Sequence, residues 1–235
     1  VEKAMMDLRP GFPSDGLGGQ GNPLASDSPE VWDRLISAVG PASLLVVIGL
    51  RMSTFLKHRL APEDILQEAL LDAWRHRARH EWRGLRSFRA WLLTIIDHRV
   101  RDAAAYESAA KRGGEASTLP FSALELSDSQ GEHGSAFPGP VRSTTPSRIA
   151  IHREQAEMMR AALDALPSDL GEVVRLRLFE QLTTEEIAGR LNIGPSAVRH
   201  RFRRGAELYQ RRLMFELASR TWTSGPPSAK DGPSL

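Results

Sequence analysis

The sequence from residue 182 to residue 204 reads LTTEEIAGRLNIGPSAVRHRFRR. Within it, Thr183 and Glu186 have the S/T-x-x-E spacing of a capping box, which predicts the start of a helix. That helix reaches a turn at residues 192–194, and Pro195 then suits the first position of a second helix. Two short helices joined by so tight a turn are the helix-turn-helix arrangement.

The second of these helices has one apolar face and one cationic face. At 100° per residue, apolar residues between Val198 and Leu213 recur on one side, and basic residues lie on the other. Guanidinium groups on a helix in the major groove can pair with guanine acceptors or with phosphates. The alternative is a surface helix whose arginines only face water, but the capping box, turn, proline and basic face coincide and together favour DNA recognition. The basic residues are Arg199, His200, Arg203, Arg204 and Arg211.

The overall composition is that of a globular protein. The 235 residues are 41% hydrophobic and 26% charged, a balance unlike that of disordered chains. Because there is no cysteine, disulfides, thiolate metal sites and thiol nucleophiles are excluded. The longest apolar run, residues 44–50, falls far short of the roughly 20 residues that cross a membrane, and no secretion signal is visible. We therefore expect a cytoplasmic protein without membrane insertion.

Composition also divides the chain into five segments. Helical signals fill two blocks, and no stretch alternates with a period of two, so strands are not expected. Gly-, Pro- and Ser-rich stretches precede, separate and follow these blocks and cannot build a core. The predicted fold is all-α, with two small helical domains joined by a flexible linker. The segments are a disordered leader (1–29), a first helical domain (30–112), the linker (113–147), a second helical domain (148–218) and a disordered tail (219–235).

The distribution of charge is more informative than the net charge of +2. Residues 50–112 carry 13 basic and 8 acidic side chains, and residues 198–212 carry 6 basic and 1 acidic side chain. The rest of the chain is neutral or acidic. Two basic islands of this kind are typical of a protein that binds a polyanion such as a nucleic acid.

An acidic stripe lies on a predicted helix of the first domain. Asp64, Glu68 and Asp72 recur every four residues and therefore share one helix edge. These carboxylates could serve acid-base catalysis or a divalent metal, face water, or dock a basic partner. His76 and His80 also have the spacing of metal ligands, but no set of further ligands accompanies them, so no metal site is predicted.

Aromatic and basic residues are interleaved between residues 82 and 101. Trp82, Phe88 and Trp91 lie among five arginines. This mixture suits an unpaired nucleic acid strand, because bases stack on rings while guanidinium groups follow the phosphates. The alternative is an ordinary helical core, which is favoured for Trp91, whereas strand binding is favoured for Trp82 and its basic neighbours.

Together the two domains resemble the extracytoplasmic-function (ECF) sigma factors of bacteria, over roughly residues 30–112 and 148–214. Residues 62–68, PEDILQE, resemble that family's A/P-E-D-hydrophobic-hydrophobic-Q-E/D motif in region 2. Residues 88–102, FRAWLLTIIDHRVRD, resemble the block that recognises and opens the minus-10 promoter element. Four further stretches resemble the family's region 4, whose final helix reads the minus-35 element. They are ALP at 165–167, EVV at 172–174, EIA at 186–188 and VRHR at 198–201.

The resemblance implies a promoter-specificity subunit rather than an enzyme, with no cofactor and no catalytic or metal-binding residue. The implied partners are promoter DNA and core RNA polymerase, through its β′ clamp and β flap, and an anti-sigma protein is left open. The implied polymerase-binding residues are Asp64, Gln67, Glu68 and Asp72. Those for the minus-10 element are Trp82, Arg83, Arg86, Arg89, Trp91, His98, Arg99 and Arg101. Those for the minus-35 element are Ala197, Arg199, His200, Arg201, Arg203 and Arg204.

The sequence departs from the family pattern at a few positions. His98 stands where asparagine is usual, and Asn192 replaces a turn glycine, a change that asparagine tolerates in the left-handed conformation. These changes bear on base preference rather than on the fold. Two rival functions are a free-standing helix-turn-helix regulator and, from another class, a helical enzyme that uses Asp64 and Glu68 as metal ligands or as an acid-base pair.

Overall fold

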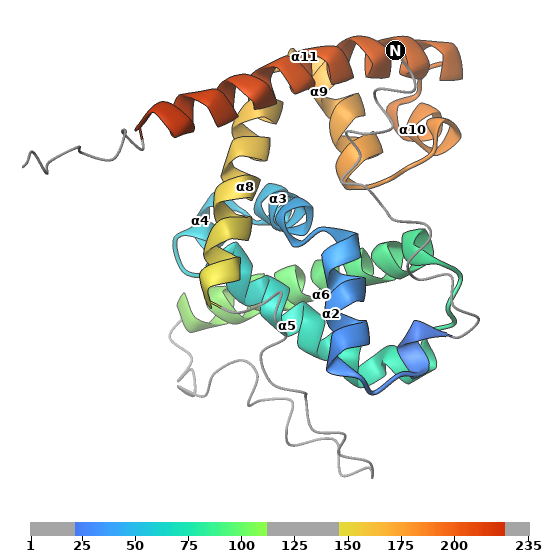
Figure 1. The fold of residues 1–235 in the computed structure, drawn as a ribbon, viewed down its shortest axis with the longest axis vertical. Helices are drawn as coiled ribbons and strands as arrows, with labels where there is room; N and C mark the ends of the chain where they lie inside the picture. Colours follow the sequence, from blue (N-terminus) through green and yellow to red (C-terminus); the bar gives the residue numbers. More distant parts are fainter. Residues whose placement is uncertain (1–21, 112–145, 224–235) are drawn as a thin grey trace, which may run out of the picture. The chain divides into compact units, whose positions relative to one another are not determined.

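The computed structural model describes residues 22–111 and 146–223. Within these ranges the chain forms helices and turns and no strand, which confirms the all-α prediction (Figure 1). Nearly all of the predicted linker, and most of the predicted leader and tail, lie outside the described residues.

The described chain divides into two compact units. Unit 1 contains the residues up to Ala156 together with Leu178–Gln181, and unit 2 contains the remainder. The elements that begin in unit 1 are η1 (Pro23–Ala25), α2 (Pro29–Val39), α3 (Pro41–Arg51), α4 (Thr54–Lys57), α5 (Pro62–His76), η2 (Arg77–Arg79), α6 (Leu85–Lys111) and α8 (Pro146–Asp164). Those that follow are α9 (Ser168–Val174), the π-helical turn η5 (Arg175–Phe179), α10 (Thr184–Leu191) and α11 (Pro195–Thr223).

Proline is the first residue of α2, α3 and α5 in unit 1. Pro29, Pro41 and Pro62 stand at the first position of α2, α3 and α5, where the missing N–H leaves no donor unpaired. Gly40, at φ +80°, ends α2 and leads directly into α3. At the start of α5, the backbone N–H of Ala61 donates to the carboxylate of Asp64 over 3.2 Å. The chain breaks visible in the sequence therefore become the helix boundaries.

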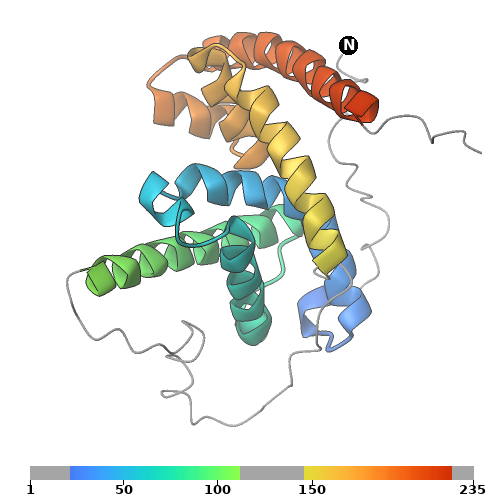
Figure 2. The same cartoon turned by 90° about the vertical axis from the view of Figure 1, so that its left-hand side faces the viewer.

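The core of unit 1 is built around buried aromatic rings. Trp32 lies edge-on to Trp74 with ring centroids 5.2 Å apart, and edge-on to Phe88 at 5.9 Å. All three are almost completely buried. They come from α2, α5 and α6, and α5 crosses α6 in both views (Figures 1 and 2). Edge-to-face packing of such large rings stabilises the contact beyond the burial of apolar area.

The apolar residues of α2 and α3 belong to this core. Among the described residues, no single helix combines the length and the apolar composition needed to span a membrane. Only as a pair, bent by 60° at their junction, do α2 and α3 reach that composition. Most of α3 is buried within unit 1.

In unit 2, α9 packs closely along α11. Gly205 of α11 is buried at this contact. A Cβ atom at this position would lie 2.7 Å from Val174 Cγ2 and 3.2 Å from the carbonyl oxygen of Leu170. The two helices approach so closely because residue 205 has no side chain.

We expect Gly205→Ala to lower the free energy of unfolding by about 1–3 kcal/mol, because the added methyl group overpacks the α9–α11 contact. Gly189→Ala is the matched control, since a Cβ atom on Gly189 of α10 meets nothing within 4 Å. In that helix alanine should stabilise by up to about 1 kcal/mol. Urea unfolding followed by far-ultraviolet circular dichroism measures both variants. Equal stability of the two variants would contradict the prediction.

The structure differs from the sequence-based segments at their edges. Residues 22–28, assigned to the leader, are placed in unit 1, where Leu24 is 1% exposed. α8 begins at Pro146, inside the predicted linker, and α11 continues to Thr223, beyond the predicted end at residue 218. Burial of the single residue Leu24 can fix a short polar stretch such as residues 22–28 to unit 1. The average composition of that stretch does not show that one of its residues is buried.

Candidate nucleic-acid interface

The helix-turn-helix has the local geometry that its sequence predicts. The backbone N–H of Thr183 donates to the Glu186 carboxylate at 2.6 Å, and the N–H of Glu186 donates to Thr183 Oγ1 at 3.1 Å. This is the reciprocal pair of a capping box. Asn192 ends α10 in the left-handed region at φ 52° and ψ 45°, and Pro195 is the first residue of α11.

A small apolar core fixes the angle between α10 and α11. Its buried members come from α9, η5, α10 and α11, and partly buried residues from the loop before α10, from α10, from the turn and from α11 pack against them. Hydrophobic contact of this kind holds the backbone of α11 in place whatever its outer face carries. The buried members are Val173, Leu176, Ile187, Ala188 and Val198, and the surrounding ones are Leu182, Leu191, Ile193 and Phe202.

The outer face of α11 presents basic side chains to solvent, among them four of the six residues predicted for the minus-35 element. They are Arg199, His200, Arg203 and Arg204, all exposed. The other two residues predicted on this helix lie differently. Arg201 is half-buried, with its Nε 3.7 Å from the carboxylate of Asp169, and Ala197 is also half-buried. Of the residues predicted for the minus-35 element, the four exposed ones belong to the cationic face, where Arg211 is also exposed, and Arg201 faces an acidic neighbour.

The second predicted surface lies at the start of α6 and in the loop before it. Trp82 is half-buried with its ring centroid 6.2 Å from that of Phe88, and Trp91 is half-buried next to the same ring at 5.8 Å. Arg83 is exposed and donates to the Glu81 carboxylate at 2.6 Å, a hydrogen bond that raises the pKa of Arg83. The other exposed residues predicted for this surface are Arg86, His98 and Arg101.

Two arginines predicted to bind the minus-10 element are buried instead. Arg89 is 1% exposed and donates to the backbone carbonyls of Val39 at 2.6 Å and Phe179 at 2.7 Å, all within unit 1. Burial, together with the nearby charge of Arg51, lowers the pKa of Arg89 to about 10, so its side chain remains protonated at neutral pH.

Arg99 is the second buried arginine. It is 7% exposed, and its Nη2 lies 3.2 Å from the carboxylate of Asp72. A buried guanidinium that satisfies backbone carbonyls or a carboxylate stabilises the fold. A buried guanidinium cannot reach a DNA strand in this conformation. The candidate surface for unpaired DNA therefore excludes Arg89 and Arg99.

The acidic stripe of α5 is likewise divided between two environments. Asp64 and Gln67 are exposed, and Glu68 is half-buried. Asp72 is half-buried, and besides Arg99 its carboxylate has the ring Nδ1 of His76 at 3.1 Å. The amino-terminal half of the stripe therefore faces solvent, while Asp72 is tied to side chains of unit 1.

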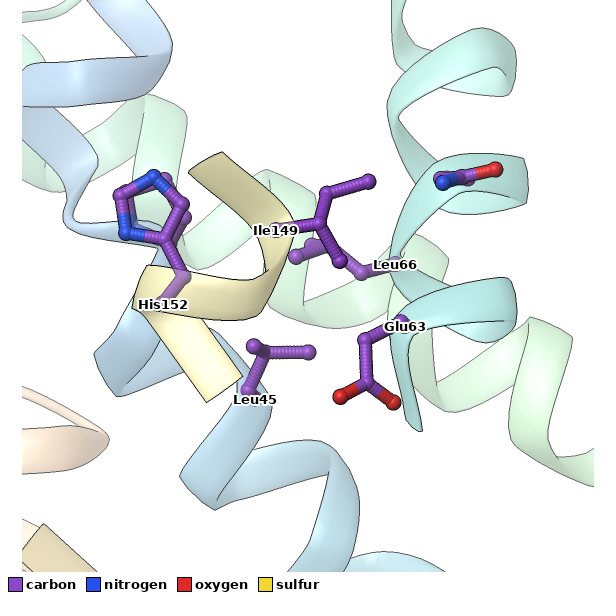
Figure 3. Close-up of a pocket in the computed structure, with 7 residues that line it drawn as sticks. Leu45, Glu63, Leu66, Ile149 and His152 are labelled. Carbon is purple, nitrogen blue, oxygen red and sulfur yellow. The ribbon is translucent and has the colours of Figure 1, made fainter. Parts of the chain in front are cut away.

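A small apolar cavity lies where the first turns of α8 meet α3 and α5 within unit 1. Leu45, Leu66 and Ile149 line it, together with Glu63 and His152. Figure 3 shows Ile149 of α8 beside Leu66 of α5. Its volume is about 10 Å³, which holds at most one water molecule. It is a packing gap and not a ligand pocket.

Sequence reasoning missed two contacts that complete the aromatic cluster. The guanidinium of Arg77 lies over the Trp74 ring, 3.7 Å from its centroid. The His80 ring stacks on Trp91 with centroids 4.4 Å apart and planes inclined by 8°. The sequence signal available was the placement of His80 two residues before Trp82. The spacing of His80 from His76 is instead typical of metal ligands. Within residues 22–111 and 146–223, no three His, Asp or Glu side chains gather closely enough to hold a metal ion.

A helical protein with a well-formed helix-turn-helix and an exposed cationic recognition face is a DNA-binding protein by class. The family model described as Sigma-70 region 2 matches residues 44–109, and the one described as Sigma-70, region 4 matches residues 156–207. These spans cover α3 to α6 and the end of α8 to α11. The chain belongs to the sigma-70 family, as a sigma factor of the ECF type, which confirms the resemblance read from the sequence.

Similar curated proteins are also named as sigma factors. The chain is 31% identical over 150 residues to the ECF RNA polymerase sigma factor SigD of Mycobacterium tuberculosis, covering 63% of this chain and 61% of the relative. It is 29% identical over 169 residues to the ECF RNA polymerase sigma-E factor of Escherichia coli K12, covering 70% and 82%. It is 28% identical over 154 residues to the probable RNA polymerase sigma factor RfaY of Xanthomonas campestris, covering 66% of this chain and 34% of the relative. The chain thus spans about a third of RfaY and about three fifths of SigD.

Proposed function

We propose that this chain is a promoter-specificity subunit of bacterial RNA polymerase that acts in the cytoplasm and has no catalytic activity of its own. The observation that carries the proposal is the presence, in one chain and in the family's order, of regions 2 and 4. The exposed basic face of α11 supports it, because region 4 must present such a face to duplex DNA.

Three surfaces of the chain bind different partners in this proposal. Arg199, His200, Arg203 and Arg204 contact the upstream, minus-35 duplex, and the exposed part of the α5 stripe, Asp64, Gln67 and Glu68, docks on the clamp of core polymerase. The surface around Trp82, Trp91, Arg83, Arg86, His98 and Arg101 captures the opened strand at the minus-10 element. The two DNA surfaces would engage different stretches of one promoter. The β flap is proposed as a second polymerase contact, and an anti-sigma protein as a regulator.

The energetics predict that the subunit binds DNA weakly without polymerase. Taking bases out of a duplex costs a few kcal/mol, which the phosphate contacts of one small surface do not offset. Binding to polymerase must supply the remainder. A free-standing helix-turn-helix regulator, by contrast, binds its duplex site tightly by itself.

Reconstituted transcription tests the proposal directly. Core polymerase is incubated with genomic fragments, with and without this chain, and new transcripts are mapped to their start sites. We expect start sites that require the chain, each preceded by two separated sequence elements. Tight protection of a palindromic duplex by the chain alone, with no new start sites, would favour the free-standing regulator.

A further inference from the structure

The loop between η2 and α6 places an imidazole ring on a tryptophan. His80 lies parallel to Trp91, with ring centroids 4.4 Å apart and planes inclined by 8°. This is the geometry in which a planar heterocycle stacks on an indole, and it is also the way a nucleobase stacks on an aromatic side chain in a strand-binding protein. His80 therefore covers one face of a ring that lies in the proposed strand-binding surface.

The Trp91 ring packs on the aromatic core of unit 1 through Phe88. Phe88 lies 5.8 Å from Trp91 and itself contacts Trp32 at 5.9 Å. Because Phe88 and Trp32 are almost completely buried, Trp91 is a fixed platform. His80 belongs to a loop outside this core, so of the two stacked rings His80 is the one that can move.

The loop has a hinge where it joins α6. Gly84 stands at φ +93°, a conformation that side-chain-bearing residues rarely adopt, and a Cβ atom there would meet nothing within 4 Å. Its carbonyl oxygen accepts the N–H of Phe88 at 3.1 Å, which fixes the first turn of α6 immediately after the hinge. Within the loop, Glu81 and Arg83 form a hydrogen-bonded ion pair that is exposed to solvent. Rotation at Gly84 would leave the first turn of α6 in place, while Trp82, whose ring packs on Phe88 with centroids 6.2 Å apart, would move with the loop.

When His80 is stacked on Trp91, the hydrogen-bonding capacity of its ring is not fully used. Its Nε2 atom is buried and has no hydrogen-bond partner among the described residues, which costs free energy that an open loop would recover. Burial, and then the charge of Arg83, lower the pKa of His80 against the opposing effect of Glu81. The stacked ring is therefore the neutral imidazole at neutral pH, a flat uncharged heterocycle like a base.

We propose that His80 is an intramolecular stand-in for a nucleobase. It covers Trp91 in the free protein, and the loop 80–84 swings about Gly84 so that an unpaired base of the captured strand takes its place. This inference rests on the proposed capture of an opened strand and adds a residue that controls access to it. A base gains the stacking face only after the imidazole leaves, so the loop opposes binding of unpaired DNA by the subunit alone.

Removing the imidazole tests the inference because its effect has an unusual sign. Stacking of a base on an aromatic ring stabilises a bound strand, so Trp91 without the imidazole over it should bind unpaired DNA more tightly. We expect His80→Ala to raise the affinity of the full chain for a labelled single-stranded DNA of about 12 nucleotides by roughly fivefold or more, measured by fluorescence anisotropy at low salt. His80→Phe, which keeps a stacking ring, should stay within about twofold of the parent chain.

His58→Ala is the matched control, because His58 is exposed at the end of α4 and should leave strand affinity unchanged. Thermal melting of each variant shows that it is folded. An independent readout is the proton spectrum of the His80 ring, whose signals should lie upfield in the free chain because of the Trp91 ring current. On addition of the strand they should move to ordinary positions.

Weaker strand binding by His80→Ala would overturn the inference, because His80 would then be a direct DNA contact. Unchanged binding would overturn it too, as would His80 signals that stay upfield when the strand is bound. If any of these results accompanies chain-dependent transcription, only the inference fails. If no variant binds the strand and no chain-dependent start sites arise with core polymerase, the proposed function fails and the inference fails with it.

Discussion

Replacing Arg199 and Arg203 together with alanine should lower transcription from a promoter that depends on its upstream element by roughly a hundredfold. Both side chains are exposed on the same face of α11, and each well-placed arginine contact with a base or phosphate contributes about 1–3 kcal/mol. Neither is placed in the apolar core beneath the helix-turn-helix, so the fold should be retained. Reconstituted transcription at increasing subunit concentration measures the effect.

Arg201→Ala is the control for this pair. Arg201 lies on the same helix but is half-buried near Asp169, so its removal should change promoter activity by less than about threefold, in keeping with the small energy of a partly exposed ion pair. The double variant should also weaken the dependence of binding on salt, by about 0.9 in the logarithmic slope for each phosphate that is no longer neutralised. A double variant with parental activity would exclude the cationic face of α11 from promoter recognition.

Arg99→Met should destabilise unit 1 by about 2–3 kcal/mol, the cost typical of losing a hydrogen bond to a charged group inside a protein. Methionine fills much of the space of the arginine stem, but it leaves the half-buried Asp72 carboxylate without the guanidinium at 3.2 Å. In a chain of this size such a destabilisation lowers the melting temperature by about 5–10 °C. Thermal unfolding followed by circular dichroism provides the measurement.

Arg101→Met separates this structural role from strand binding. Arg101 lies two residues further along α6, is exposed, and donates to the backbone carbonyl of Asp97 in its own helix at 3.1 Å. Its replacement should leave stability within about 0.5 kcal/mol and should weaken binding to single-stranded DNA. The opposite pattern, with Arg99→Met stable but weak in strand binding, would return Arg99 to the DNA surface.

The helix-turn-helix could be predicted because its structure depends on neighbours in the sequence. Thr183 caps α10 through Glu186 three residues away, and Asn192 supplies the left-handed turn residue without a distant partner. Gly40 and Pro41 similarly mark a break within the span of one helical turn. Such local rules operate before any tertiary contact forms.

The environment of individual charges could not be predicted in the same way. Arg89 and Arg101 share one helix and one residue type, yet Arg89 is buried against two carbonyl groups from other segments and Arg101 is exposed. Which arginine points inward depends on how α6 lies on α2 and α5, and helical periodicity does not supply that. The His80–Trp91 stack was missed for the same reason, because it joins a loop to a helix face eleven residues away.

The aromatic core of unit 1 has a consequence for spectroscopy. Of the five tryptophans in the chain, four (Trp32, Trp74, Trp82 and Trp91) belong to unit 1. Rings held in a fixed asymmetric arrangement give a near-ultraviolet circular dichroism signal that vanishes when the packing dissolves, whereas far-ultraviolet ellipticity reports the helices of both units. Melting curves recorded at the two wavelengths will therefore coincide only if the two halves of the protein unfold together.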